Sequence, residues 1–347
     1  LAAAGVEERV HIPVHILRKL YPLLDNAKWK ITVSLAWNGE NWEMLEIEEG
    51  DTTAQHYGLA VDLGSTTVVA RLLDCNSGEI LKEVSCFNKQ IQWGTDILSR
   101  IFYCKDNKEK LEEVRRATVE SICECMDKLD ASHSALSMVI AGNTTMIHFL
   151  LGMDAFCVFY TPHAVHADRP GFQLARDLDI PLKGYVYCYP AKSNYLGGDI
   201  ISGMIDTELY KKNEISVFFD IGTNGELVIG NKEFLLCGAG AAGPALEGGV
   251  VRTGMRADVG AVDEVKIRDG NIFVHVIGNS APQGICGSGI IDLIAELFLE
   301  GWIDIRGKLS PEKSPLIQER DNQLCVEYAP GLYFYQKDID EFIRTKS

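Results

Sequence analysis

One sequence pattern occurs twice in this chain and constrains its fold more than any other feature. Residues 57–71 (YGLAVDLGSTTVVAR) and residues 215–230 (ISVFFDIGTNGELVIG) each read as an apolar strand, an aspartate, a turn rich in glycine and polar residues, and a second apolar strand. Either stretch alone fits an ordinary hairpin as well as it fits a phosphate-binding turn. Two copies, with their aspartates at positions 62 and 220, indicate a duplicated architecture.

The two turns contain the groups that would hold a phosphate beside a metal ion. Successive backbone N–H groups form a concavity that suits an anion, and neighbouring hydroxyls add donors. Asp62 and Asp220 would each repel a bare phosphate, so they fit such a site only with a cation such as Mg²⁺ in between. The candidate binding residues are Gly64, Ser65, Thr66 and Thr67 in the first copy and Gly222, Thr223, Asn224 and Gly225 in the second.

Length, charge and cysteine usage exclude several classes of protein. The 347 residues are enough for two or three domains, and the formal net charge of -16 argues against nucleic-acid binding and against adsorption to an anionic membrane. No run of 18 apolar residues occurs, and the first residues lack the pattern of a signal peptide. The ten cysteines are scattered without a C-x-x-C pair, which favours free thiols in a reducing cytoplasm over a metal centre.

The remaining periodicity predicts an α/β chain. Its first 55 residues read as one helix and a hairpin turning at Asn38-Gly39, and three successive antiparallel strands follow. The expected helices are 12–24, 96–102, 108–130, 144–151, 200–209, 290–300 and 338–346. The expected strands outside the two repeated hairpins are 29–37, 42–47, 80–88, 137–141, 185–190, 265–268 and 272–276, with short strands over 302–335.

Polar or glycine-rich turns precede three of these helices. Asn143 follows the strand 137–141, and a strand, a polar turn and a helix start often bind a ligand together. Asp199 follows two glycines in the first turn of its helix, where the helix dipole alone would favour an acid. The stretch 284–289 (GICGSG) could let a ligand approach the backbone or could pack a helix closely on a sheet.

The loop over 156–184 carries His163 and His166, which fit a solvated loop better than a metal site.

The paired hairpins, the helix between them and the late glycine turn resemble the actin, heat-shock chaperone and sugar kinase superfamily. The resemblance covers residues 57 to the end and implies a two-lobed actin-like ATPase fold of duplicated ribonuclease H-like domains. In that superfamily each lobe contributes one phosphate hairpin to ATP. The stretch 284–289 is similar to the adenosine loop, and the helix from Gly198-Asp199 is similar to the first interdomain connection.

Three further motifs narrow the resemblance. They are residues 141–148 (AGNTTMIH), 238–249 (GAGAAGPALEGG) and 284–289, and they resemble the ATP-dependent reductive activators of corrinoid-dependent enzymes. Such activators carry an N-terminal [2Fe–2S] domain, a linker and a small middle domain before the ATPase core. The iron–sulfur cysteines have no counterpart here, so either this chain is a fragment that lacks that domain or this member has none. The abrupt start and the stop inside a helix favour a fragment. Ser65 departs from the family's usual threonine but keeps the hydroxyl.

The resemblance implies a division of the chain and of its chemistry. Residues 1–55 would be a remnant of the middle or linker domain, 56–209 the first ATPase lobe and 210–347 a second lobe truncated at its end. Asp62 and Asp220 would hold hydrated Mg²⁺, and Asp199 would position the attacking water. ATP would contact the two turns together with Asn143, Gly240, Gly284, Gly287, Ser288 and Gly289. The expected activity couples ATP to reduction of Co(II) to Co(I) in a partner corrinoid protein. The electron donor and the partner's identity are not implied, and a homodimer remains an open alternative.

Other functions on the same fold stay open at this point. A small-molecule kinase would need a hydroxyl-bearing substrate and a catalytic base, and no base is identified. An activator of a 2-hydroxyacyl-CoA dehydratase would need clustered cysteines for a [4Fe–4S] centre, and the sequence shows no such cluster. A filament or nucleotide switch would polymerise or change shape with ATP.

Overall fold

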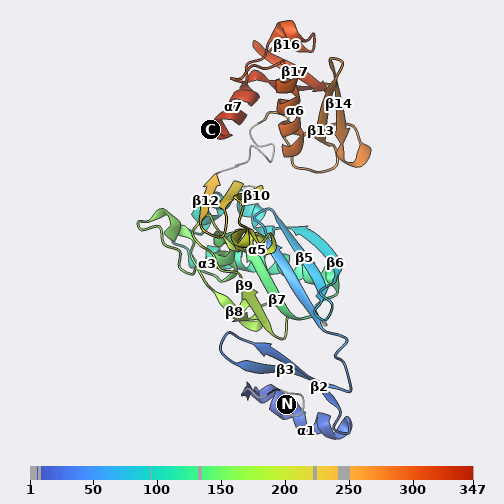
Figure 1. Ribbon diagram of the computed structural model, residues 1–347, viewed down its shortest axis with the longest axis vertical. Coiled ribbons are helices and arrows are strands. Elements are labelled where there is room, and N and C mark those ends of the chain that lie inside the picture. The colour runs from blue at the N-terminus through green and yellow to red at the C-terminus, as the bar shows by residue number, and fades with distance from the viewer. Residues whose placement is uncertain are drawn as a thin grey trace. The chain divides into compact units, whose positions relative to one another are not determined.

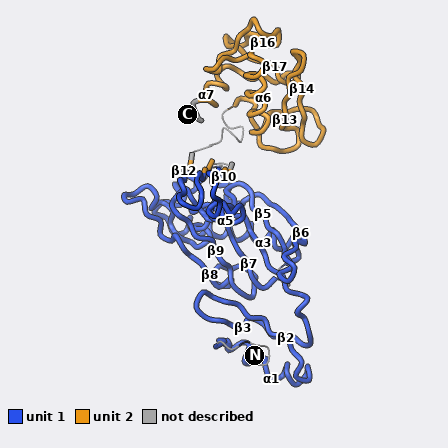
Figure 2. The backbone as a smooth tube through the Cα atoms, viewed as in Figure 1, with its two compact units in different colours: residues 1–218, 228–237 blue, residues 219–227, 238–347 orange. Residues whose placement is uncertain are grey.

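The computed structural model describes residues 6, 9–94, 96–131, 135–221, 225–240 and 251–346. The chain divides into two compact units, residues 1–218 with 228–237 and residues 219–227 with 238–347 (Figure 2). The boundary between the units passes through the second of the two repeated hairpins. Each unit is therefore described separately below.

The N-terminal segment is a helix packed on a three-stranded sheet (Figure 1). Ile16 on the helix and Met44 and Ile47 on the sheet form its small buried core. The two long strands are antiparallel, and Gly39 lies in their connection with φ of 103°. The predicted hairpin is confirmed, because glycine readily adopts such a positive φ. The elements are β1 (Val10–His11), α1 (Val14–Asn26), β2 (Ile31–Trp37) and β3 (Trp42–Glu49), with sheet order β1-β3-β2.

A six-stranded sheet forms the body of the first unit. Its order is β6-β5-β4-β7-β9-β8, and β4, β5 and β6 are antiparallel neighbours as predicted. Strands β4, β7 and β9 run parallel, so their carboxyl ends lie at one edge of the sheet. The strands are β4 (Tyr57–Leu63), β5 (Thr67–Asp74), β6 (Ile80–Phe87), β7 (Ala135–Gly142), β8 (Gly171–Leu174) and β9 (Tyr185–Cys188).

Helices cover this sheet and complete its core. Helix α3 buries Val114, Ile122 and Met126 in the same cluster as Val61 and Ile140 of the sheet. These helices begin at side-chain caps, which satisfy backbone N–H groups that have no partner within the helix. They are α2 (Ile97–Cys104), capped by Asp96, α3 (Lys108–Leu129), capped by Asn107, and α4 (Thr144–Leu150), capped by Asn143.

Helix α5 (Gly198–Asp206) and the sheet β10-β11-β12 follow. Ile200, Leu209 and Val228 form a small core, and Gly203 lies so close to Phe218 that an added Cβ would be 2.4 Å from its ring. The strands of this sheet are β10 (Ser216–Ile221), β11 (Gly225–Gly230) and β12 (Leu235–Gly240).

The described residues of the second unit form two further three-stranded sheets and two α-helices. Its core gathers around Leu293 and Leu297 of α6, with Trp302 and Phe334 also buried. The sheet orders are β14-β13-β15 and β16-β17-β18. The elements are β13 (Ala261–Arg268), β14 (Asn271–Val276), β15 (Gly284–Ile285), α6 (Gly287–Leu299), β16 (Ile317–Arg320), β17 (Gln323–Ala329), β18 (Leu332–Tyr335) and α7 (Gln336–Lys346).

Strands β1, β8, β12 and β15 were not predicted from the sequence, and helix α6 begins earlier than predicted. Strand β8 lies in the segment expected to be a loop and pairs antiparallel with β9 at the sheet edge. Helix α6 begins at Gly287, so Gly287 and Gly289 lie inside its first turn rather than before the helix. Within the described ranges, no helix combines the length and the apolar character needed to cross a bilayer.

Candidate functional site

The first repeated turn lies at the carboxyl edge of the six-stranded sheet. Strand β4 ends at Leu63 and is in register with Gly142 at the end of β7. Asp62 pairs with Ala141 across the same two strands, and its side chain is exposed. In open α/β sheets, ligands bind outside the carboxyl ends of the strands. The structure therefore places Asp62 where a ligand can reach it.

Glycines let three segments approach one another closely at this edge. A Cβ on Gly64 would lie 2.4 Å from the carbonyl oxygen of Thr67, within the turn itself. A Cβ on Gly142 would lie 2.7 Å from the carbonyl oxygen of Leu63, and one on Gly197 would lie 2.5 Å from that of Gly142. Any larger side chain would push these backbones apart. The turn, the end of β7 and the start of α5 thus meet at one place.

Asn143 and Asp199 come to this edge with those segments. Asn143 caps α4, accepting a hydrogen bond from the Thr145 N–H at 3.0 Å. Asp199 lies half-buried in the first turn of α5, where its Oδ1 accepts from the Ile200 N–H at 2.8 Å. Both residues therefore have a structural role at a helix start, Asn143 as an N-cap and Asp199 as an acid that the helix dipole favours. Their position also brings them to the sheet edge where the Gly64–Thr67 turn lies.

The second repeated hairpin is described only in part. Asp220 lies near the end of β10, is half-buried, and has its carboxyl pKa raised by that burial. Gly225 opens β11, and Gly240 is the last residue of β12. The predicted turn residues Gly222, Thr223 and Asn224 lie outside the described residues.

The third predicted glycine turn packs closely inside the second unit. A Cβ on Gly284 would lie 2.4 Å from the carbonyl oxygen of Thr253, and one on Gly289 would lie 2.3 Å from that of Val262. Gly287 opens α6, and Ser288 is exposed beside it with its Oγ 3.3 Å from the Cys286 Sγ. Close packing is therefore confirmed for Gly284 and Gly289, and a role with adenosine stays a prediction.

Two buried residues behind the first turn were not predicted from the sequence. Asn88 and Arg100 are each 0% exposed, and both donate hydrogen bonds to carbonyl groups of the turn. A signal for Arg100 was present, because it follows Ile97 by three residues and precedes Cys104 by four. It therefore sits on the apolar face of its helix, where a charge is unusual. Asn88 has no comparable signal in the sequence.

The histidines of the loop over 156–184 do not form a metal centre in the described part of the chain. No group of three or more potential ligands from His, Cys, Asp or Glu occurs there. His148 is buried in α4 instead, and its Nδ1 lies 2.8 Å from the Thr144 carbonyl oxygen. Burial lowers the pKa of His148, which favours the neutral ring.

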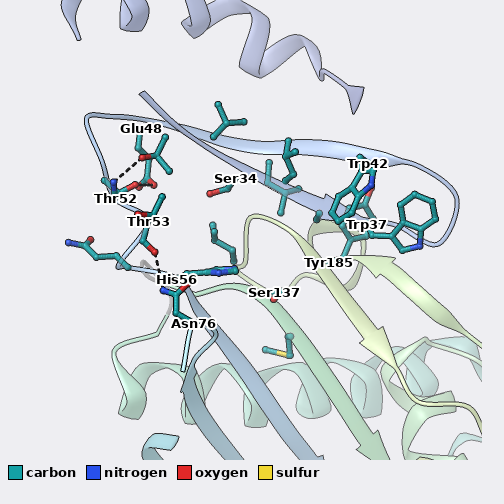
Figure 3. A pocket seen from close by; sticks show the side chains of 18 of the residues that line it. Ser34, Trp37, Trp42, Glu48, Thr52, Thr53, His56, Asn76, Ser137 and Tyr185 are labelled. Carbon is teal, nitrogen blue, oxygen red and sulfur yellow. Dashed lines mark hydrogen bonds between the residues drawn. The ribbon is translucent and has the colours of Figure 1, made fainter. Parts of the chain in front are cut away.

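A pocket of about 500 Å³ lies at the opposite edge of the same sheet, between β2 and the first residues of β7 and β9. Figure 3 shows Trp37, Trp42 and Tyr185 at one end, with Glu48 and Asn76 at the other. None of the predicted site residues that the structure describes lines it. Its position at the amino ends of β7 and β9 separates it from the candidate site.

Family models account for nearly the whole chain. Residues 1–54 match the RACo linker region, 57–212 the RACo middle region, and 214–347 the C-terminal domain of RACo, the ASKHA domain. The chain belongs to the RACo family. These matches confirm the predicted resemblance to the reductive activators of corrinoid-dependent enzymes. They also confirm the predicted α/β fold class.

Individual relatives agree with the RACo assignment. The corrinoid activation enzyme RamQ of Eubacterium limosum is 36% identical over 258 residues, which are 72% of this chain and 43% of RamQ. The [Co(II) methylated amine-specific corrinoid protein] reductase of Methanosarcina barkeri is 23% identical over 319 residues, covering 82% of this chain and 56% of that protein. A solved structure of a reductive activator for corrinoid, iron-sulfur protein matches with a TM-score of 0.84 and 34% identity, covering 99% of this chain and 58% of that one. The chain thus spans about half the length of the RACo relatives it matches.

Proposed function

We propose that this RACo chain is the ATP-binding and ATP-hydrolysing core of a redox activator. The activator would couple ATP to the reduction of Co(II) to Co(I) in a partner corrinoid protein. The electron would come from an iron–sulfur domain outside this chain. The names of the relatives support a corrinoid partner, and the ASKHA assignment of the C-terminal region supports a nucleotide. The single observation that carries the proposal is the convergence of the Gly64 turn, Gly142 and Gly197 at one sheet edge.

The residues at this edge fit a nucleotide phosphate bound with a cation. The turn supplies backbone N–H groups and three hydroxyls, and the close approaches of Gly142 and Gly197 leave no side chain at those positions. The exposed carboxylate of Asp62 would contribute acidic oxygen to hydrated Mg²⁺, which prefers oxygen ligands and retains water. Magnesium bound there would neutralise phosphate charge during hydrolysis.

Asp199 is proposed to orient the attacking water. Its carboxylate is held by the Ile200 N–H at the start of α5, so it can accept a further hydrogen bond without turning away. Gly197 fixes the start of α5 against the end of β7, which positions this carboxylate relative to the turn. Orientation of a water is a recurrent task in phosphoryl transfer.

The second half of the chain is proposed to complete the nucleotide site. Asp220, like Asp62, would hold hydrated Mg²⁺. The second turn would bind phosphate as the Gly64–Thr67 turn does, through Gly222, Thr223, Asn224 and Gly225. Asn143, Gly240, Gly284, Gly287, Ser288 and Gly289 would contact the remainder of ATP. We retain residues 56–209 and 210–347 as the proposed two lobes, with 1–55 as the proposed remnant of the middle or linker domain. Cytoplasmic location belongs to the same proposal.

Nucleotide titration and a corrinoid assay test this function in two steps. The chain should bind Mg·ATP in a calorimetric titration and hydrolyse it, and Asp220→Asn should weaken both the binding and the hydrolysis. In the full-length protein, the same substitution should abolish ATP-dependent reduction of the corrinoid cofactor, followed by its absorption spectrum. Asp127→Asn, on the exposed face of α3, is the matched control. Unchanged ATP binding and hydrolysis in Asp220→Asn would contradict the site. ATP hydrolysis without corrinoid reduction would contradict the redox function alone.

A further inference from the structure

Three consecutive carbonyl groups of the first turn are held by the protein interior. The side-chain amide of Asn88 donates to the Gly64 oxygen at 2.9 Å, and its backbone N–H donates to the Thr66 oxygen at 2.8 Å. The Arg100 guanidinium donates from Nη1 to the Ser65 oxygen at 2.6 Å. The turn therefore presents all three oxygens to Asn88 and Arg100.

Peptide geometry then fixes the direction of three N–H groups. The peptide bonds of this turn are trans, since the one cis bond in the described chain is Thr161-Pro162. In a trans peptide, the C=O of one residue and the N–H of the next point in opposite directions. The N–H groups of Ser65, Thr66 and Thr67 consequently point away from Asn88 and Arg100. Successive N–H groups on one side of a turn form an anion-binding concavity.

A chain of buried hydrogen bonds holds Asn88 and Arg100 in place. The Arg100 Nη1 also donates to the Gln90 Oε1 at 3.1 Å, and the Gln90 amide donates to the Thr118 hydroxyl of α3. The Asn88 Oδ1 accepts from the Gln90 N–H at 3.0 Å. Asn88, Gln90, Arg100 and Thr118 are each 0% exposed. Buried networks of this kind fix a single geometry, because breaking one bond leaves a polar group without a partner.

Arg100 also brings a full positive charge to the inner side of the turn. Lysine and arginine are rarely buried completely, since removing the charge from water is costly. This charge lies one peptide group behind the Thr66 N–H, where it polarises that peptide and attracts an anion on the far side. The location of a buried cation directly behind the candidate phosphate turn requires an explanation beyond packing.

We infer that Asn88 and Arg100 are positioning residues for phosphate binding, which hold the Gly64–Thr67 turn with its N–H groups directed toward the ligand. This inference rests on the proposed function and deepens it, since it specifies a polyphosphate as the group recognised at this turn. Neither residue touches the phosphate itself. Arg100 acts through the Ser65 carbonyl, and Asn88 acts through those of Gly64 and Thr66.

The test compares a charged ligand with an uncharged one. Arg100→Gln, Arg100→Lys and Asn88→Ser are titrated with Mg·ATP and with adenosine, and thermal unfolding is recorded for each. The matched control is Arg115→Gln, which removes an arginine that pairs with Glu112 and Asp179 in the same unit. We expect Arg100→Gln to lose about 10-fold or more in Mg·ATP affinity, the usual range for a lost outer-shell partner. Adenosine affinity should stay within about two-fold, and Arg100→Lys should recover part of the loss because it restores the charge.

The outcomes separate this inference from the proposed function. If the wild-type chain binds no Mg·ATP, the proposed function fails first. If the wild type binds and Arg100→Gln binds equally well, the positioning role is wrong. Equal losses for ATP and adenosine, or a loss in Arg115→Gln of the same size, would show a general effect of stability. If none of the three variants folds, the network is a folding element and the assignment is withdrawn.

Discussion

The two repeated aspartates occupy different environments, although their sequence contexts match. Asp62 is exposed at the end of β4, whereas Asp220 is half-buried at the end of β10 and has its pKa raised by loss of water contact. Burial of a carboxylate destabilises its charged form unless a cation or donor compensates. Asp220 therefore costs the folded protein stability at neutral pH, which is typical of a functional site.

Asp220→Asn is predicted to stabilise the ligand-free chain at neutral pH. The carboxyl pKa is higher in the folded state than its ordinary value of 3.8, so the folded state holds the proton more tightly. As pH rises through this folded-state pKa, Asp220 ionises in the folded protein, and the folded state loses stability relative to the unfolded state. The variant should therefore unfold at higher urea than the wild type at pH 7, with a difference that shrinks toward about pH 4. Asp127→Asn should show no such trend, and a less stable Asp220→Asn at pH 7 would refute the argument.

At the scale of elements, the candidate site depends on how closely α5 approaches β7. Gly197 precedes α5, and a Cβ there would meet the Gly142 oxygen at 2.5 Å and the Asn143 Cα at 2.7 Å. Both obstacles are backbone atoms, which cannot turn aside as a side chain could. Any substitution must therefore move one of the two elements.

Gly197→Ala is predicted to weaken both stability and Mg·ATP binding. The overlap should destabilise the chain by about 1–3 kcal/mol, the usual cost of overpacking. Displacement of Asp199 and Asn143 should then lower nucleotide affinity. Urea unfolding and calorimetric titration measure the two effects. Gly238→Ala is the control for stability, because its added Cβ would have no neighbour within 4 Å among the described residues. A fully stable Gly197→Ala would show that α5 is free to shift.

The elements that could be predicted from the sequence are those with long or repeated patterns. Helix α3 and the hairpin β4–β5 matched closely, because apolar residues recur at the helical or strand period. Strand β8 was missed because four residues at a sheet edge carry too short a pattern. The partners of Asn88 and Arg100 were missed because they are separated by 24 and 35 residues along the chain. Local periodicity indicates which face of its helix or strand a residue occupies. It carries no information on hydrogen-bond partners that are distant in the sequence.

The N-terminal segment is attached to the six-stranded sheet through Glu46 of β3. Its carboxylate contacts the Lys183 ammonium at 2.7 Å and also pairs with Lys19 of α1. Burial alone would raise the pKa of Glu46, but the hydrogen bonds from Lys183, Lys19 and the Ile47 N–H lower it to about 2. One residue of the segment thus forms an ion pair with Lys183, which lies two residues before β9 of the six-stranded sheet.

Glu46→Gln is predicted to loosen this attachment. The stabilisation present above the ordinary pKa of 4.5 is lost as pH falls toward about 2, because the folded state then must take up a proton it binds poorly. The variant should lose about 1–2 kcal/mol at pH 7, since the lysine heads are half exposed and screened. Limited proteolysis should also cleave the connection over 50–56 sooner. Glu49→Gln, at the exposed end of the same strand, should match the wild type. Equal cleavage rates in both variants would contradict the attachment.

At the scale of the whole molecule, the two repeated hairpins fall on different sides of the division between compact units. Asp62 belongs to the first unit and Asp220 to the second. The proposed function requires both to act on one bound nucleotide with its metal ion. Energetic coupling between the two residues is therefore the property that would join the units into one ATPase.

A double-mutant cycle on Asp62→Asn and Asp220→Asn tests that coupling. If both carboxylates serve one Mg·ATP, removing the second after the first should cost less than removing it alone. The interaction energy should reach about 1 kcal/mol or more, because groups that share a ligand are not independent. Calorimetric titration of the wild type, both single variants and the double variant gives this value. In the control cycle of Asp62→Asn with Asp127→Asn, the effects should add within about 0.5 kcal/mol. Additive losses in the first cycle would mean that the two hairpins do not share one Mg·ATP. Hydrolysis at one hairpin could not then change the conformation of the other unit.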